Sequence, residues 1–288
     1  MAEELERHGI GLDVGVGVVP IVSGACLFDL ACGRPDVRPT AKDGAAAAAS
    51  ALDPQNAGKP LQRGNVGAGT GCTVGKALGP QRAMKSGLGE SVQTAGQLVC
   101  GAVAAVNACG DVVDPDTGKP VAGVLTPDGR AVGSTTQAFL DLAAQPPLEA
   151  KKGDDAAEGS KHEDDATKGT EGTGRKGSAA TGNEGPSSSS PLPRTNTTIS
   201  CVVTNARLTK AQATKVAQMS ADAYAHAIRP THTTNDGDTI FVMATGQVDA
   251  GVDFVGILAT RALELAIADA ARQAAGDYGF KAACDLAD

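Results

Sequence analysis

The chain has 288 residues, of which 37 are Gly, and aromatic residues make up only 2% of it. Its 33 acidic and 25 basic side chains give a formal net charge of −8 without a basic stripe, which argues against binding to a nucleic-acid backbone. No apolar run reaches the roughly 18 residues that a membrane-spanning helix requires. Residues 1–8 lack the basic-then-apolar pattern of a signal peptide, so we expect a cytoplasmic protein with no membrane partner.

The first part of the chain carries the pattern of a sheet. Apolar residues alternate with small or polar ones over residues 10–19, which predicts a strand or a pair of strands. Residues 97–113 are rich in Val and Ala and run into a turn signature at residues 114–119. We therefore predict a sheet hairpin in this region, covered on both faces.

A glycine-rich stretch between these patterns extends over residues 64–76 and includes Gly67, Gly69 and Gly71. The third glycine is misplaced for a dinucleotide fingerprint, and Lys76 is followed by Ala where a phosphate-binding loop needs Ser or Thr. Backbone N–H groups in such a loop can also hold a developing oxyanion. A structural turn, an oxyanion loop and a phosphate loop are three alternatives at this point.

The middle of the chain, residues 146–195, contains no Val, Ile, Met, Phe, Tyr or Trp. Such a segment cannot bury enough apolar surface to offset the entropy of ordering, which predicts a disordered linker that reaches to Asn196. His162 lies among acidic residues there, and a solvated charge run is favoured over a weak metal site. The linker separates an N-terminal part, residues 1–145, from a C-terminal part, residues 197–288.

The C-terminal part interleaves strands and helices. Strands are predicted over residues 198–204 and 239–245 from their β-branched and apolar composition, the second of them buried. Helices are predicted over residues 210–228, with Thr209 as the N-cap, and over residues 252–275. This order of elements indicates the α/β or α+β class.

Seven cysteines are spread over the chain, an odd number without the spacing of a zinc site. In a cytosolic protein we expect them to be reduced and to pack as small apolar side chains. At most one of them is expected to be reactive. The cysteines therefore point to no metal centre.

Asn196 and Thr197 lie where the linker ends and a strand begins. A Thr at such a junction can attack the carbonyl before it and form an ester that water opens, which leaves Thr197 with a free α-amine. An α-amino group titrates near pH 7.7–8.0 and can serve as the base for its own hydroxyl. The alternative, favoured by these residues alone, is an ordinary polar start of a strand.

Asp236 and Asp238 flank a Gly just before the strand at residues 239–245. Two carboxylates in this arrangement can hold an ammonium group or orient a hydroxyl. The alternative is an Asp-Gly turn that leads into the strand. A calcium loop does not fit, because the Gly and the closing Glu are not at the required offsets.

Five motifs in order resemble one known family: GIGLDVGVGVVPIV, GNVGAGTGCTVGK, AVNACGDVVDP, NTTISCVVTNARLTKAQ and IRPTHTTNDGDTIFVMATG. Together they resemble the DmpA-type aminopeptidases, whose relatives include β-aminopeptidases and nylon-oligomer hydrolases. The resemblance covers most of the chain outside the linker. It implies an α/β fold in four layers, an αββα sandwich similar to the N-terminal-nucleophile hydrolases.

The resemblance also implies a self-processing aminopeptidase or amidase that acts on small peptides or amides through an acyl-enzyme. Thr197 then corresponds to the nucleophile, and the self-cleavage follows Asn196. Lys76 is similar to the lysine that assists the nucleophile, and Asn107 resembles the asparagine that stabilises the oxyanion. The acidic pair that positions the nucleophile and its amine is matched by Asp236 and Asp238. The resemblance then implies that the glycine-rich loop contacts the substrate and its oxyanion and does not bind a phosphate.

Family members need no metal or other cofactor, and they usually assemble as tetramers of αβ pairs. This sequence departs from them in lacking a long N-terminal stretch, which leads us to expect a truncated fold. Phe28 or its neighbours stand where nylon-oligomer hydrolases carry a tyrosine. The alternative function is accordingly that of a non-catalytic remnant, which serves at most in binding or as a structural protein.

Overall fold

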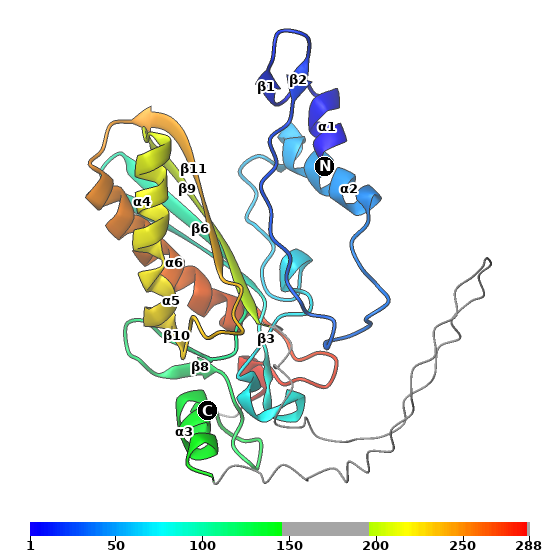
Figure 1. The fold of residues 1–288 in the computed structure, drawn as a ribbon, viewed down its shortest axis with the longest axis vertical. Coiled ribbons are helices and arrows are strands. Elements are labelled where there is room, and N and C mark those ends of the chain that lie inside the picture. The colour runs from blue at the N-terminus through cyan, green and yellow to red at the C-terminus, as the bar shows by residue number, and fades with distance from the viewer. Residues whose placement is uncertain (146–195, 287–288) are drawn as a thin grey trace, which may run out of the picture.

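The computed structural model describes residues 1–145 and 196–286, so the linker predicted over residues 146–195 lies outside the described residues. Its main sheet has four strands in the order β11–β9–β6–β5. These strands are β5 (Leu88–Ala95), β6 (Leu98–Asn107), β9 (Thr197–Ala206) and β11 (Thr239–Val248). The pairs β5–β6 and β6–β9 are antiparallel, whereas β9 and β11 are parallel. Strands from both parts of the chain thus form one sheet (Figure 1).

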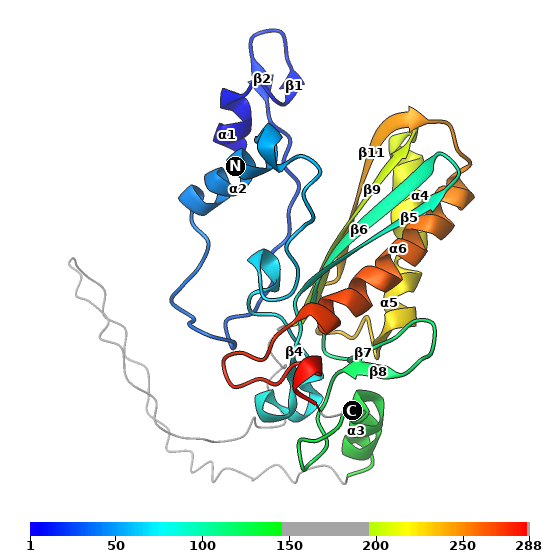
Figure 2. The same cartoon turned by 180° about the vertical axis from the view of Figure 1, so that it is seen from behind.

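Helices cover one face of this sheet. They are α4 (Lys210–Ser220), α5 (Asp222–Ala227) and α6 (Val252–Gln273), and both views show them on the same side (Figures 1 and 2). α6 packs against β5 and β6, and α4 and α5 pack against α6. The α/β class predicted from the sequence is confirmed. The sheet and its helical cover form adjoining β and α layers of the expected αββα arrangement.

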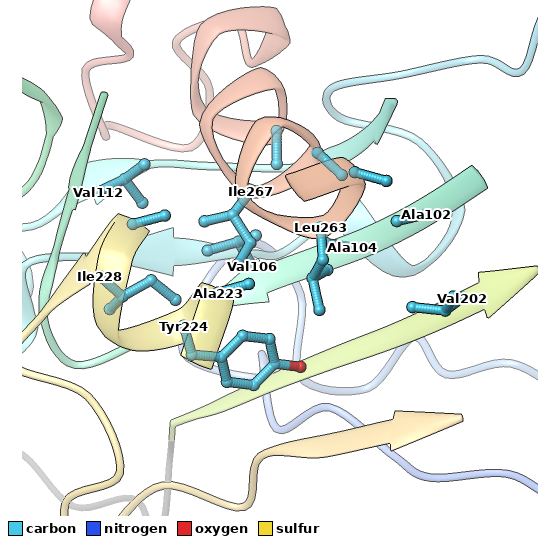
Figure 3. Packing of buried hydrophobic residues seen from close by; sticks show 14 of the residues in the cluster. Ala102, Ala104, Val106, Val112, Val202, Ala223, Tyr224, Ile228, Leu263 and Ile267 are labelled. Atoms are coloured by element: carbon cyan, nitrogen blue, oxygen red, sulfur yellow. The ribbon is translucent and has the colours of Figure 1, made fainter. Parts of the chain in front are cut away.

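Small residues allow α6 to lie close to the sheet. Gly89 of β5 faces this helix so closely that a Cβ there would collide with the main chain of α6. Figure 3 shows Leu263 and Ile267 of α6 packed over β6, with Val106 and Tyr224 in the same buried cluster. Gly89 is therefore a packing requirement, because a bulkier residue there would separate the helix from the sheet.

The opposite face of the sheet carries apolar side chains that are partly exposed. Val92, Gly101, Val203 and Met243 pair across the four strands in one row. Val92 and Met243 are each 60% exposed, and Val203 is 41% exposed. Alternate residues of a strand share a face, so Thr197 lies on the same face as Val203. We call this surface the open face.

Shorter elements surround the main sheet. A second sheet has the order β10–β7–β8, and two-stranded pairs form between β1 and β2 and between β3 and β4. These elements are α1 (Ala2–Arg7), β1 (Leu12–Asp13), β2 (Val18–Val19), α2 (Ala41–Leu52), β3 (Thr73–Val74), β4 (Met84–Lys85), β7 (Asp111–Val113), β8 (Pro120–Ala122), α3 (Thr135–Ala143) and β10 (Ile228–Arg229). The described residues also form the 3₁₀ turns η1 (Pro54–Asn56), η2 (Gly67–Gly69), η3 (Lys76–Leu78), η4 (Pro80–Arg82) and η5 (Ala283–Asp285). Figures 1 and 2 show α1, α2, β1 and β2 standing apart from the main sheet. Within the described parts of the chain, helices fall short of the length and apolar character needed to cross a membrane.

Two predictions for the N-terminal part meet different outcomes. The strand pair expected over residues 10–19 is present as β1 and β2, although it is short. The sheet hairpin expected in the region of residues 97–113 is present as β5 and β6, but the chain leaves this sheet after Asn107 and the open face is not fully covered. Gly110 packs against the main chain of Pro230 at this break, and β7 then joins the second sheet. The passage of the chain from the main sheet to the second sheet depends on tertiary contacts, which the local composition of the sequence does not indicate.

The C-terminal predictions were closer to the structure. Thr209 is the N-cap of α4, where its side chain accepts a hydrogen bond from the Gln212 N–H. The single helix predicted over residues 210–228 is instead two helices, α4 and α5, followed by β10. The strand predicted over residues 239–245 exists but is not buried, because β11 is an edge strand and one of its sides belongs to the open face.

Candidate active site

Thr197 is the first residue of β9 and lies beside the carbonyl group that precedes it. Its Oγ1 donates to the main-chain oxygen of Asn196 across 2.6 Å. Both residues are buried, with 8% of Thr197 and 5% of Asn196 exposed. The Gly237 N–H donates to the same Asn196 oxygen across 2.9 Å. The hydroxyl and the carbonyl are thus held together at the end of a central strand.

The two aspartates predicted as a pair lie in the loop that leads into β11. Asp236 forms a parallel β-bridge with Asn196, and its Oδ2 accepts from the main-chain N–H and the Oγ1 of Thr233, at 2.8 Å each. Among the described residues its buried Oδ1 has no hydrogen-bond partner. An unpartnered buried carboxylate oxygen is costly, so this atom is a ready acceptor for an ammonium group.

Asp238 holds the main chain next to Thr197. Its Oδ1 accepts from the Thr198 N–H across 2.8 Å, and its Oδ2 lies 3.0 Å from His232 Nδ1. Burial raises the pKa of Asp238, while the Thr198 N–H and His232 oppose that rise. The role of His232 was not foreseen, because a histidine six residues from an aspartate carries no recognisable motif.

Lys76 and Asn107 contact each other directly. Lys76 Nζ donates to the main-chain oxygen of Asn107 across 3.0 Å and to its Oδ1 across 2.8 Å. The Thr73 N–H also donates to that Oδ1, and Asn107 Nδ2 donates to the Phe28 carbonyl, at 3.1 and 3.0 Å. Asn107 pairs with Thr197 in the β6–β9 ladder, so this contact lies beside the start of β9.

The pKa of Lys76 is about 8, because burial disfavours its charged form. Cys72, Cys109, Asp236 and Asp29 act against that effect but do not cancel it. An amine with this pKa exchanges protons near neutral pH, as a group that assists a nucleophile must.

The glycines of the glycine-rich loop serve two purposes, a backbone conformation at Gly67 and close packing at Gly69 and Gly71. Gly67 adopts a φ of +52°, which side-chain-bearing residues avoid. A Cβ on Gly69 would collide with the main chain of Leu88, and one on Gly71 would collide with the Asp29 carboxylate. The Gly69 N–H donates to the Val66 carbonyl across 2.8 Å, so it is held within the turn of the loop.

Lys85 supports the glycine-rich loop through hydrogen bonds, and this role was not predicted from the sequence. The side chain is fully buried, and its Nζ donates to the carbonyls of Ser86, Cys72 and Gly69 across 2.9, 3.0 and 3.4 Å. Burial lowers the pKa of Lys85. A lone Lys beside Ser and Gly resembles a surface residue, and only the folded loop turns its carbonyls inward.

A cavity of about 180 Å³ opens beside the Lys76–Asn107 contact. Asp29 lines it together with the apolar side chains of Phe28 and Phe280. Phe28 therefore lies near the site, where its carbonyl accepts from Asn107 Nδ2. Within residues 1–145 and 196–286 there is no group of three His, Cys, Asp or Glu side chains arranged to hold a metal ion.

The sequence profile of peptidase family S58 matches residues 2–283. The chain belongs to this family. The S58 assignment confirms the resemblance to the DmpA-type aminopeptidases. An uncharacterized aminopeptidase of Mycobacterium leprae (strain TN) is 34% identical over 249 residues, which are 85% of this chain and 55% of that protein.

The chain is also similar to a second aminopeptidase and to a solved structure. An uncharacterized aminopeptidase of Mycobacterium tuberculosis (strain H37Rv) is 32% identical over 257 residues, which are 86% of this chain and 58% of that protein. This chain thus spans little more than half the length of these two relatives. Among solved structures, the L-aminopeptidase D-Ala-esterase/amidase from Ochrobactrum anthropi matches 76% of this chain and 47% of its own, with 16% identity and a TM-score of 0.42.

Proposed function

We propose that this chain is a self-processing N-terminal-nucleophile hydrolase of the aminopeptidase or amidase type, with Thr197 as its nucleophile. The observation that carries the proposal is the 2.6 Å contact between Thr197 Oγ1 and the carbonyl oxygen of Asn196. Membership of a peptidase family and relatives named as aminopeptidases support the reaction class.

The self-cleavage begins with attack of Thr197 Oγ1 on the Asn196 carbonyl carbon. A C–O ester bond forms, the C–N peptide bond breaks, and the Thr197 nitrogen takes up the proton that the hydroxyl loses. Water then hydrolyses the ester and leaves a carboxylate on Asn196 and a free hydroxyl and α-amine on Thr197. Lys76, with a pKa of about 8, carries the proton between these groups.

Substrate hydrolysis reuses the same hydroxyl. The free α-amine accepts the Oγ1 proton, Oγ1 bonds to the substrate carbonyl carbon, and the amine product leaves with the proton. Water releases the acyl group and restores the hydroxyl. In this reaction the buried Oδ1 of Asp236 holds the new ammonium form of Thr197. Asn107 stabilises the oxyanion together with N–H groups of the glycine-rich loop other than that of Gly69, which is bonded within the loop. The small cavity favours small peptides and amides as substrates.

We also propose, on the family resemblance alone, that the αβ pair self-associates, with a tetramer as the expected assembly. No cofactor takes part in the proposed reaction. The αβ pair would consist of residues up to Asn196 and residues 197–288.

A second candidate function is binding without catalysis. The observation that favours it is the open face, where Val92 of β5 and Met243 of β11 are each 60% exposed. Large apolar patches of this kind are typical of interaction surfaces. In this alternative, the residues around Thr197 are an ordinary strand start that never reacts.

The deciding experiment is the intact mass of the purified chain after a day of incubation. The enzyme proposal expects two pieces, one ending at Asn196 and one starting at Thr197. Thr197→Ala should stay whole and Thr197→Ser should still cleave, because Ser keeps the hydroxyl. Cleavage that persists in Thr197→Ala would exclude Thr197 as the nucleophile, and a parent chain that stays whole would favour binding.

A further inference from the structure

The carbonyl oxygen of Asn196 receives two hydrogen bonds in the uncut chain. One comes from Thr197 Oγ1 across 2.6 Å and the other from the Gly237 N–H across 2.9 Å. When a hydroxyl attacks a carbonyl, negative charge develops on that oxygen, and a fixed N–H in contact with it stabilises the charge. The main-chain donor is already in place before any reaction.

The loop that carries Gly237 is fixed on both sides. Asp236 bridges to Asn196 and accepts two hydrogen bonds from Thr233, and the Asp236 N–H donates to the Thr233 carbonyl across 3.0 Å. On the other side, Thr239 Oγ1 donates to the Gly237 carbonyl across 3.1 Å. A donor held in this way needs little reorganisation when charge develops.

Glycine at position 237 also gives the nucleophile room. A Cβ at this position would lie 3.0 Å from Thr197 Oγ1 and 3.8 Å from the Asn196 oxygen. The first distance is tighter than most real contacts of a Cβ, so a side chain would press on the attacking oxygen. Position 237 therefore combines an N–H donor with the absence of a side chain.

We propose that the main-chain N–H of Gly237 is the oxyanion donor of the self-cleavage step. The inference rests on the proposed function, because it assumes that Thr197 attacks Asn196. It assigns the self-cleavage oxyanion to the Asp236–Asp238 loop. Asn107 then serves mainly the oxyanion of substrate hydrolysis, with its Nδ2 directed to the Phe28 carbonyl before the cut.

The test replaces the Gly237 N–H by an ester oxygen, through incorporation of glycolic acid into the full chain. This change removes the donor and leaves the side chains as they are. We expect self-cleavage, followed by intact mass, to slow by about 100-fold or more, as for loss of one oxyanion donor. The matched control is the same ester at Gly96, in the turn between β5 and β6, which should cleave at the parent rate.

A second variant separates the effect of the N–H donor from the effect of the missing side chain. Gly237→Ala keeps the N–H and adds the Cβ that crowds Thr197 Oγ1, so we expect a smaller loss than with the ester. A third measurement needs no cleavage: in the uncut Thr197→Ala chain, the Gly237 N–H should exchange slowly with solvent deuterium. Fast exchange of that hydrogen would contradict the proposal even if the ester variant failed to fold.

The outcomes distinguish this inference from the proposed function. If the parent chain cleaves and the Gly237 ester cleaves equally fast, the oxyanion assignment is wrong while self-cleavage stands. If the parent chain never cleaves, the proposed function fails, and the inference fails with it. A slow ester variant together with a normal Gly96 control would establish both.

Discussion

Asn107 and Thr197 face each other as a pair in the antiparallel ladder between β6 and β9. Asn107 ends its strand and Thr197 begins the other, although residues 146–195 separate the two parts of the chain. The Lys76–Asn107 contact and the hydroxyl of Thr197 are therefore brought together by sheet register. The site is assembled before any peptide bond is cut.

Self-cleavage should depend on pH through Lys76. The pKa of this amine is lowered to about 8 by burial, so the side chain is cationic below that pH and neutral above it. If neutral Lys76 accepts the proton, the rate rises through about pH 8 and then levels. The α-amine of Thr197 does not exist in the uncut chain and cannot contribute.

The measurement is the first-order rate of cleavage as a function of pH, for the parent and for Lys76→Met and Lys76→Arg. Both variants should be slow throughout, because one lacks the amine and the other stays charged. A parent rate that does not change between well below and well above pH 8 would remove Lys76 from the mechanism.

Asn107→Asp should affect substrate turnover more than self-cleavage. The aspartate can still accept from Lys76 and from the Thr73 N–H, but it lacks the Nδ2 donor. Loss of one oxyanion donor corresponds to about a 100- to 1,000-fold lower kcat. The new carboxylate should also raise the pKa of Lys76 and move the self-cleavage profile to higher pH. Equal losses in both reactions would show that Asn107 serves both oxyanions.

Lys85→Met should loosen the glycine-rich loop. The substitution removes the donor to the carbonyls of Cys72 and Ser86. The Cys72 carbonyl keeps the Ser86 N–H as a donor, whereas loss of a partner by a buried carbonyl such as that of Ser86 costs about 1–3 kcal/mol. We expect a lower midpoint of urea unfolding and slower self-cleavage. Lys42→Met, at an exposed position on α2, is the control and should leave the midpoint unchanged. An unchanged midpoint for Lys85→Met would show that the glycine-rich loop keeps its conformation without the Lys85 side chain.

Gly89→Ala should destabilise the fold by forcing α6 away from the sheet. The added Cβ would collide with the main chain of this helix, and overpacking of that kind costs about 1–3 kcal/mol. Gly17→Ala is a matched control, because its Cβ would meet nothing within 4 Å. Urea unfolding of the two variants gives the comparison, and similar midpoints would contradict the packing argument.

Local features of the sequence were sufficient for several elements. The β-branched run after Asn196 is β9, the Ala- and Leu-rich segment from Val252 is α6, and Thr209 caps α4 through contacts within one turn. Thr197, Asp236 and Asp238 stood out as residues, and the family resemblance chose between their alternatives. Asn107 came from the resemblance alone, and the structure brings it together with Lys76 beside the strand that starts at Thr197.

Features that depend on distant parts of the chain were not predictable. Lys85 meets carbonyls that only the folded loop turns inward, and His232 approaches Asp238 through the path of its own loop. The break between β6 and β7 follows from packing at Gly110. The donor at Gly237 is a main-chain group, which no residue type in the sequence reveals.

The central place of β9 in the sheet has a consequence for the proposed product. β9 is hydrogen-bonded to β6 on one side and to β11 on the other, so a cut before Thr197 would leave the two pieces interlocked by a continuous ladder. Unfolding would then become a dissociation into two polypeptides. The melting temperature of the cut protein would increase with its concentration, whereas that of the uncut Thr197→Ala chain would not.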